Sequence, residues 1–366
     1  MKLKLKNTPE QVELVKAMGS KDLTVAREAQ EAFAAFLGPV VQQVLNQAGT
    51  ANAIFADAAF DEDDSPSYPL DLYYNNGDNH VSVWMQSVAG GLPSSHVEGM
   101  NELKISTYRL DSAINLLKRY VRRARLDVVS KGVERMAQEI LVKQERNAWA
   151  VILKALGEAS TGGNAHTVQA SSRTNFMLSD LNDLMTRVRR INESFANGTP
   201  DVAYSNGLTD LYMSPERMAD VRAMAYNPVN TKGANNVAGT NASGTIAMPD
   251  GVRESIYNSA GATELFGVTL NEMNEFGIGK KYNTLFGEFD GISFAPSTDD
   301  LVVGLDNSKG AFIRPVATQA DSGGAVVTLA DDQWSVRSEK LGFYSFVEEG
   351  RVCIDSRAVV GLSLEA

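Results

Sequence analysis

The sequence predicts an α+β protein organised around one long helix. From about residue 127 to residue 157, apolar residues recur at helical spacing without a break, which corresponds to about 30 residues and about 45 Å of helix. From residue 175 onward, short strand patterns mix with helix patterns. The apolar stripe of this spine helix is expected to face late strands of the chain; the residues concerned are Ile140, Ala148 and Ile152 on the helix and Phe343, Phe346 and Val352 on the strands.

Residues 1–66 are expected to form an arm with two helices rather than a domain. Thr8-Pro9 is a favourable helix start with Pro at the first position, and a second apolar stripe begins at about Asp22. Gly38-Pro39 is expected to interrupt that second helix. Neither helix is long enough to build its own core, so the stripe must dock elsewhere. The acidic stretch 57–67 is expected to be a solvated linker.

Residues 67–110 are expected to form a long, extended two-stranded loop. Asn76-Gly77 is the favoured dipeptide of a type I′ hairpin turn, and residues 104–110 alternate apolar and polar residues as a strand does. The tip contains an irregular turn at Gly91, Leu92 and Pro93. Because a two-stranded flap cannot bury itself, we expect something outside the monomer to cover it.

Basic residues cluster between this loop and the spine helix, within residues 116–125. They are Lys118, Arg119, Arg122, Arg123 and Arg125. Phosphate binding is one interpretation. The favoured one is ion pairing with acidic surfaces within or between subunits, because the chain is acidic and Tyr120 is the only interleaved aromatic residue. Asp61 and Asp63 are the expected carboxylate partners across a subunit boundary.

The remainder, from residue 175, is expected to form an α+β domain and returning strands. Helices are expected at 176–191 and after Ser214-Pro215, where Ser is the cap and Pro the first helical residue. Residues 226–261 are expected to form a long loop. Strands are expected within Ala203–Met213 and at Phe266–Leu270, Gly291–Ala295, Leu301–Val303, Ala311–Val316, Trp334–Arg337, Gly342–Glu348 and Val352–Ile354.

The sequence predicts no catalytic, cofactor-binding or metal-binding site. Three histidines, His80, His96 and His166, lie in turn-rich segments without metal-ligand spacing and are expected to be solvated. Residues 277–281 lack the spacing of a phosphate loop. Adjacent Glu348 and Glu349 should face opposite ways on a strand, so they cannot flank one bond. Cys353 is expected to be a buried small hydrophobe.

Composition excludes several classes of protein. The formal net charge is -11 and the sequence pI is near 4.9. A protein that binds the phosphates of nucleic acid usually has a positive net charge, at least in its binding domain. A single cysteine excludes internal disulfides. No apolar run approaches the roughly 18 residues of a membrane span, and the N-terminus lacks the apolar stretch of a signal peptide, so neither a membrane partner nor secretion is expected.

The order of these parts resembles that of the major capsid protein of tailed bacteriophages, a fold shared with encapsulin shells and the floor of herpesvirus capsids. Several strings also resemble the family locally. They are Gly91-Leu-Pro93 with Val97-Glu-Gly99 at the loop tip, Lys143–Ala150 in the spine helix, Leu211–Arg217 at a strand-to-helix step of the axial domain, and Lys340–Arg351 in the C-terminal strand region.

The resemblance implies a domain division and a structural role without enzyme activity or cofactor. The expected parts are an N-terminal arm (1–66), the extended loop (67–110), a peripheral domain with the spine helix (111–174), an axial domain (175–330) and C-terminal strands (331–366). The implied partners are other copies of the chain in hexamers and pentamers, with scaffolding, portal and decoration proteins. The shell would enclose double-stranded DNA without sequence-specific binding, in a virion assembled in the host cytoplasm.

Two alternatives stay open at this point. An encapsulin-like compartment would hold protein cargo in place of DNA, and an oligomeric enzyme or binding module would show a discrete small assembly and a polar pocket. The expected arm begins within the first few residues, without a long cleavable leader, so scaffolding is expected to come from a separate protein. The sequence does not specify the triangulation number, the host, or any covalent crosslinking.

Overall fold

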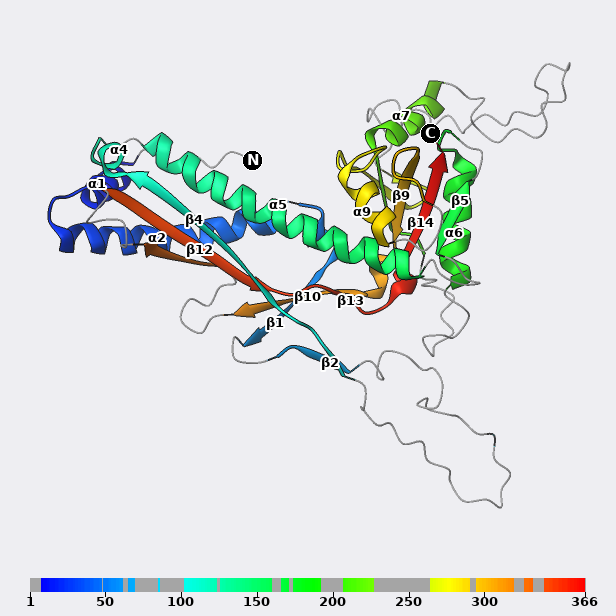
Figure 1. Cartoon of the computed structure of the whole chain (residues 1–366), viewed down its shortest axis with the longest axis horizontal. Coiled ribbons are helices and arrows are strands. Elements are labelled where there is room, and N and C mark those ends of the chain that lie inside the picture. The colour runs from blue at the N-terminus through cyan, green and yellow to red at the C-terminus, as the bar shows by residue number, and fades with distance from the viewer. Residues whose placement is uncertain are drawn as a thin grey trace, which may run out of the picture. The chain divides into compact units, whose positions relative to one another are not determined.

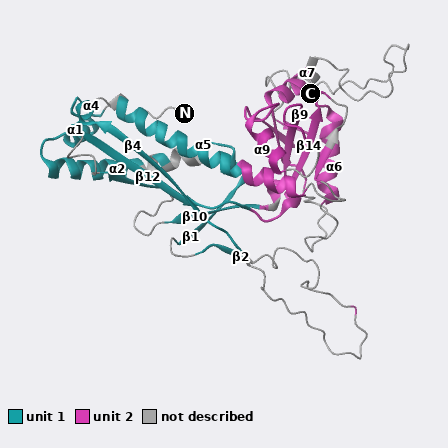
Figure 2. Ribbon diagram, in the orientation of Figure 1, with its two compact units in different colours: residues 1–68, 103–148, 312–352 teal, residues 69–102, 149–311, 353–366 magenta. Residues whose placement is uncertain are grey.

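The computed structural model describes residues 8–47, 49–61, 65–69, 85, 102–123, 126–159, 166–170, 174–191, 207–226, 264–289, 294–318, 326–331 and 339–365. The chain folds into two compact units, each assembled from three separate stretches of sequence (Figure 2). The first unit comprises residues 1–68, 103–148 and 312–352, and the second comprises residues 69–102, 149–311 and 353–366. Both units contain helices and strands, which confirms the predicted α+β class.

Two helices open the first unit. Helix α1 (Pro9–Met18) begins at the predicted Thr8-Pro9 step, and α2 (Leu23–Gln47) begins after Asp22, whose Oδ1 accepts the backbone N–H of Thr24 at 3.1 Å. The predicted interruption at Gly38-Pro39 is wrong, because the backbone of α2 is helical throughout. Leu37 and Val41, on either side, are fully buried in one core, and this packing outweighs the local cost of a proline in the helix. A short helix, α3 (Ala51–Ile54), follows.

The first unit is built on a six-stranded sheet in which β12 occupies the centre. Strand β12 pairs antiparallel with β4 along its whole length, and it pairs antiparallel with β11 on its other side (Figure 1). Strand β10 pairs with the last residue of β12, Glu349. Strand β10 also pairs with β1, in parallel, and with β13. The strands are β1 (Ala56–Asp61), β4 (Tyr108–Leu117), β10 (Phe312–Thr318), β11 (Val326–Asp331), β12 (Lys340–Glu349) and β13 (Val352–Cys353). The predicted solvated linker at 57–67 is therefore wrong over residues 57–61, because these residues form a strand that pairs in parallel with β10.

The single strand predicted at residues 104–110 is instead two strands with a break. Strand β3 (Glu102–Lys104) pairs with β2 (Ser67–Pro69), and β4 starts at Tyr108. In the break, Ile105 is buried and its N–H donates to the carbonyl of Pro66 at 3.0 Å, whereas Tyr108 already pairs with Glu349 of β12. Between these two residues the chain stops pairing with β2 and begins to pair with β12. The alternation of apolar and polar residues in the sequence does not reveal this change of partner.

The spine helix is confirmed as α5 (Leu126–Ala159). Its predicted stripe is buried, and Ile140 lies in one apolar cluster with Phe343 of β12 and Phe33 of α2. The Phe33 and Phe343 ring centroids are 5.5 Å apart. The prediction that Phe346 faces this helix is wrong, because strand alternation turns it to the other face of the sheet, where the Arg109 guanidinium lies 3.7 Å from its ring centroid.

The second unit contains the other six-stranded sheet, in the order β5-β14-β9-β6-β8-β7. The predicted helices at 176–191 and after Ser214 are confirmed as α6 and α7, and Ser214 Oγ accepts the N–H of Arg217 at 3.4 Å as a cap. The elements are β5 (Thr167–Ala170), α6 (Leu178–Ile191), β6 (Asp210–Met213), α7 (Pro215–Tyr226), β7 (Glu264–Leu265), β8 (Val268–Glu272), α9 (Lys281–Phe289), β9 (Asp299–Leu305) and β14 (Val359–Glu365), with short 3₁₀ turns at Asn307–Lys309 and Ser356–Ala358.

Two strand predictions in this unit need correction. The strand predicted at 266–270 is a hairpin, β7–β8, whose turn residues Phe266 and Gly267 both have positive φ, 53° and 78°. The strand predicted at 291–295 is wrong for its described part, because the carbonyl of Ala295 accepts the N–H groups of Thr298 and Asp299 in a turn.

Four other strand predictions, in the two units together, are confirmed. The predicted strands at 301–303, 311–316, 342–348 and 352–354 correspond to β9, β10, β12 and β13.

A cluster of buried aromatic rings surrounds Trp149 in the second unit. The Trp149 ring is fully buried, with centroids 4.9 Å from Tyr212, 5.2 Å from Phe276 and 5.6 Å from Tyr282. Gly157, on the same helix, is required by a close approach, because a Cβ there would lie 2.8 Å from the carbonyl oxygen of Phe289. The end of α5 therefore packs directly against the end of α9.

Several predictions fall outside the described residues. They are the interior and tip of the extended loop with Gly91, Leu92 and Pro93, the linker residue Asp63, the histidines His80 and His96, the loop at 227–261 and the strand at Trp334–Arg337.

Candidate functional site

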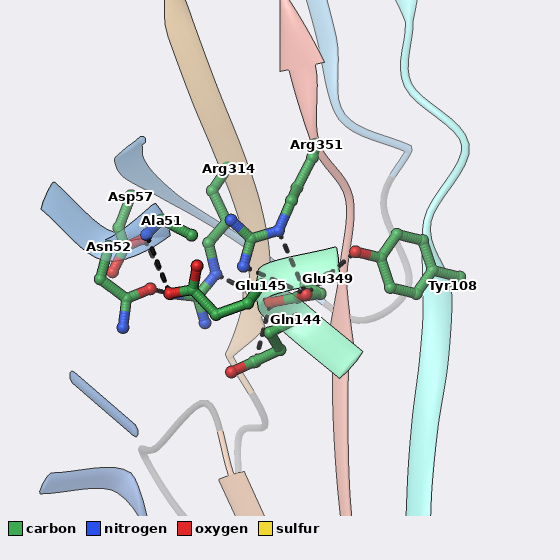
Figure 3. A network of polar contacts seen from close by, with 9 residues as sticks. All are labelled: Ala51, Asn52, Asp57, Tyr108, Gln144, Glu145, Arg314, Glu349 and Arg351. Carbon is green, nitrogen blue, oxygen red and sulfur yellow. Dashed lines mark hydrogen bonds and ion pairs between the residues drawn. The ribbon is translucent and has the colours of Figure 1, made fainter. Parts of the chain in front are cut away.

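The first unit contains a buried cluster of charged residues centred on Glu349, at the end of β12. Its side chain is fully buried, and Oε2 accepts hydrogen bonds from Arg314 Nε at 2.8 Å and Gln144 Nε2 at 3.0 Å. Oε1 accepts from the Tyr108 hydroxyl at 3.0 Å and from Arg351 Nε and Nη2, each at 3.4 Å (Figure 3). A single carboxylate thus holds together β4, α5, β10 and the segment after β12.

Residues of the same cluster also form hydrogen bonds and an ion pair with the segment between α2 and β1 and with the start of β1. Arg314 Nη1 donates to Asn52 Oδ1 at 3.1 Å and lies 3.3 Å from Asp57 Oδ1. Glu145, next to Gln144 on α5, accepts the backbone N–H of Ala51 at 3.0 Å. These contacts position the segment that precedes β1 on the spine helix and the sheet.

The charges of the cluster are buried to different degrees. Two buried guanidinium groups, of Arg314 and Arg351, face one fully buried carboxylate, and Asp57 supplies a half-exposed second one. Burial, followed by the nearby charge of Glu349, raises the pKa of Tyr108 to about 12, so its hydroxyl stays a hydrogen-bond donor at any physiological pH. The Arg351 guanidinium also lies 5.0 Å from the Phe55 ring centroid.

The sequence indicated only part of this arrangement. Glu348 and Glu349 do face opposite ways, as predicted: Glu348 accepts from the Thr107 hydroxyl at 2.8 Å on the other face of the sheet. The central role of Glu349 was missed. A signal existed in the sequence, since Arg314 interrupts an otherwise apolar strand and Arg351 follows another strand closely, but only the fold brings positions 108, 144, 314 and 349 together.

Four of the predicted basic residues lie on or next to the short helix α4 (Lys118–Arg122), and the fifth, Arg125, lies outside the described residues. Lys118 is buried, whereas Arg122 Nε donates to the carbonyl of Gly19 at 2.9 Å and so ties α4 to the end of α1. Arg119 lies over the Tyr120 ring, at 5.0 Å from its centroid. The side chains of Arg119, Arg123 and Asp61 are exposed.

The described residues offer little for catalysis or metal binding. No group of three or more His, Cys, Asp or Glu among them is placed to hold a metal ion, and none of the described helices is long and apolar enough to cross a membrane. The predicted solvation of His166 is wrong: the ring is buried, and Nδ1 lies 3.0 Å from the carbonyl of Val359, to which it donates. The strand that begins at the next residue, β5, was not predicted from the sequence.

The burial of His166 predicts that acid destabilises the second unit. Burial lowers the pKa of His166 below its ordinary value of 6.5, with the hydrogen bonds to Val359 and Ser356 and the charge of Asp355 opposing this shift and that of Arg187 adding to it. The unfolded chain then binds more protons than the folded chain once the pH falls below about 6.5. We expect the free energy of unfolding to decrease from pH 7.5 to pH 5.5, by at most about 1.4 kcal/mol per pH unit from this one group.

Urea denaturation followed by circular dichroism at several pH values measures this slope. The variant His166→Asn keeps a donor for the Val359 carbonyl and removes the titration, so its slope over this range should be smaller than that of the unmodified chain. Equal slopes would show that other groups control the acid sensitivity.

Comparison with known proteins finds similarity in structure and none in sequence. In sequence, the chain matches no protein-family model and no curated protein. In structure, it is similar to a chain of the capsid of the cyanophage P-SCSP1u, with a TM-score of 0.50 and 11% identity, over 84% of this chain and 86% of that chain. That coverage includes parts of both units, and it confirms the predicted fold.

Other solved structures are similar at slightly lower scores. The capsid of an empty GTA particle gives a TM-score of 0.49 and 13% identity, over 87% of this chain and 90% of that chain. The mature capsid of bacteriophage PhiM1 gives 0.49 and 11%, over 87% of each chain.

Proposed function

We propose that the chain is the shell subunit of a tailed-phage capsid, a structural protein that assembles with copies of itself around double-stranded DNA. The observation that carries this proposal is the likeness in fold to a phage capsid chain over 84% of the sequence. A match of that extent includes parts of both units. In this proposal the chain catalyses no reaction and holds no cofactor.

The finer features of the proposal follow from the same fold and from charge. Copies would form hexamers and pentamers of a closed shell, with scaffolding, portal and decoration proteins as partners, in a virion assembled in the host cytoplasm. A net charge of -11 would keep the packaged DNA away from the shell wall, so no sequence-specific contact is needed. The extended loop, with Gly91, Leu92 and Pro93 at its tip, would pack on a neighbouring subunit.

Ion pairs between subunits are the proposed role of the exposed basic side chains. Because Arg122 is already hydrogen-bonded to Gly19, Arg119 and Arg123 are the members best placed to meet carboxylates of a neighbour, such as Asp61 or Asp63. One exposed pair stabilises a contact by about 0–1 kcal/mol, but a closed shell repeats each contact many times.

Negative-stain electron microscopy of the purified chain tests the function. We expect closed, hollow particles of uniform diameter, and DNA inside particles purified from cells that carry the whole phage genome. The double variant Arg119→Glu with Arg123→Glu should stay folded and fail to close shells, whereas Arg135→Glu with Lys143→Glu, an equal charge change on the exposed face of α5, should assemble normally.

Two outcomes would contradict the proposal. Particles that contain a protein cargo and no DNA would indicate an encapsulin-like compartment. A single small oligomer that never closes, with or without added partners, would exclude a shell subunit altogether.

A further inference from the structure

We propose that residues 2–6 of one copy of the chain add as a strand to the outer edge of β1 in a neighbouring copy. This inference rests on the proposed function, since it names one contact through which copies would associate. It is carried by the geometry of β1, by the distribution of charge along it, and by the sequence pattern of residues 2–6.

Strand β1 presents a free edge. Residues 56–61 pair in parallel with residues 313–318 of β10, and among the described strands β10 is the only partner of β1 (Figure 1). The outer edge therefore carries a row of backbone N–H and C=O groups without a strand partner. No proline or bulge blocks it, and most side chains of β1 are exposed. Such an edge is suited to accept an extended segment through main-chain hydrogen bonds.

The two faces of β1 differ in character. By strand alternation, Asp57, Ala59 and Asp61 project to one face, and Ala56, Ala58 and Phe60 project to the other. One face is thus acidic and the other apolar. In the sequence, Asp61 is followed by Glu62, Asp63 and Asp64, which adds further negative charge at this end. A strand that fits this edge must combine a basic face with an apolar face.

Residues 2–6, which precede the described part of the chain, have this pattern. The sequence Lys2-Leu3-Lys4-Leu5-Lys6 alternates strictly at the strand period, so as a strand it would place three lysines on one face and two leucines on the other. Beside β1, the lysines would lie on the face of Asp57 and Asp61, and the leucines on the face of Ala58 and Phe60. Cross-strand pairs of opposite charge and apolar cross-strand pairs both stabilise neighbouring strands.

A neighbouring copy is the occupant that chain length favours. Arg122 of α4 hydrogen-bonds to Gly19 at the end of α1, beside the Leu117–Lys340 end of the β4–β12 pair, whereas β10, which carries β1, meets β12 at Glu349, nine residues along that strand. With residues 2–6 lying along β1, only residues 7 and 8 would join them to Pro9, and two residues span at most about 7 Å when fully extended. So short a connection favours the β1 of a neighbouring copy over that of the same chain.

Disulfide trapping tests the pairing directly. The double variant Lys4→Cys with Ala59→Cys places thiols at the centres of the two segments, on the same face for either strand direction. The native thiol interferes little, because burial raises the pKa of Cys353 to about 12. After mild oxidation we expect a ladder of covalent dimers and larger species on a non-reducing gel, and dimers only when the two single variants are mixed. Lys4→Cys with Glu139→Cys, on the exposed face of α5, should give no ladder.

Charge reversal provides a second measurement that does not depend on thiol geometry. Replacing Lys2, Lys4 and Lys6 with Glu should leave the melting temperature of the isolated subunit within about 2 °C and reduce the yield of assembled material at least tenfold, with partial rescue by Asp61→Lys. The matched control replaces the exposed lysines Lys16, Lys131 and Lys143 with Glu and should assemble better than the first variant.

The outcomes separate this inference from the proposed function. Closed shells in which only intrachain disulfides, or none, form would overturn the strand pairing and leave the shell function standing. Crosslinked oligomers that never close would support the pairing and contradict the shell. Equal assembly of the two lysine variants would also overturn the pairing.

Discussion

Glu349→Gln is expected to lower the free energy of unfolding by about 3–5 kcal/mol, because it removes one partner of a buried ion cluster. The substitution keeps the shape of the side chain but removes the one fully buried negative charge that the described residues place beside Arg314 and Arg351. Two guanidinium groups would then be buried with only the half-exposed Asp57 to balance them, and an uncompensated buried charge is costly. Thermal and urea denaturation followed by circular dichroism measure the change.

The adjacent residue supplies a matched control. Glu348→Gln removes the same charge from the same strand, but on the face where the carboxylate meets only the Thr107 hydroxyl among its described hydrogen-bond partners. We expect this variant to change stability by less than about 1 kcal/mol. Similar losses in the two variants would mean that strand β12 tolerates neither change for reasons unrelated to the buried cluster.

Trp149→Ala is expected to destabilise the second unit by about 3–5 kcal/mol. The indole is fully buried and packs against Tyr212, Phe276 and Tyr282, which come from β6, the segment after β8 and α9. Its removal would leave a cavity that these rings cannot fill together. Because the loss of a tryptophan alters fluorescence directly, the urea midpoint should be followed by far-ultraviolet circular dichroism.

A residue on the same helix serves as the reference for that measurement. Val142 on α5 is 38% exposed, and Val142→Ala should change stability by no more than about 0.5 kcal/mol. A urea midpoint for Trp149→Ala equal to that of Val142→Ala would show that the aromatic cluster contributes nothing to the core.

The parts predicted well from the sequence are those whose signal is local. The α5 stripe repeats over many turns, and the starts of α1 and α7 each combine a cap residue with Pro at the first position, so neighbouring residues suffice. The errors occur where contacts with residues distant in the sequence determine the secondary structure. Pro39 stays inside a helix because Leu37 and Val41 are packed by elements from elsewhere, and β1 is a strand because β10 lies beside it.

The candidate site also depends on residues that are distant in the sequence. Alternation along β12 correctly separated Glu348 from Glu349, yet nothing near position 349 in the sequence reveals which face is covered. That depends on Gln144, Arg314 and Tyr108, each contributed by a different element. The basic residues of α4 were found readily because they are consecutive, but their partners are not determined by their own segment.

The central position of β12 has a consequence for how the protein is made. Tyr108 and Glu349, which end the long β4–β12 ladder, are 241 positions apart in the chain. A ribosome-bound chain that has not yet reached residue 340 possesses α2, β4 and all of α5 but lacks the strand that joins them. Pairing across so long a separation is also slow, because the intervening chain must first be brought together. The first unit is thus completed only after almost the whole polypeptide has been synthesised, and an unfinished chain cannot display a finished β4–β12–β11 surface to other copies.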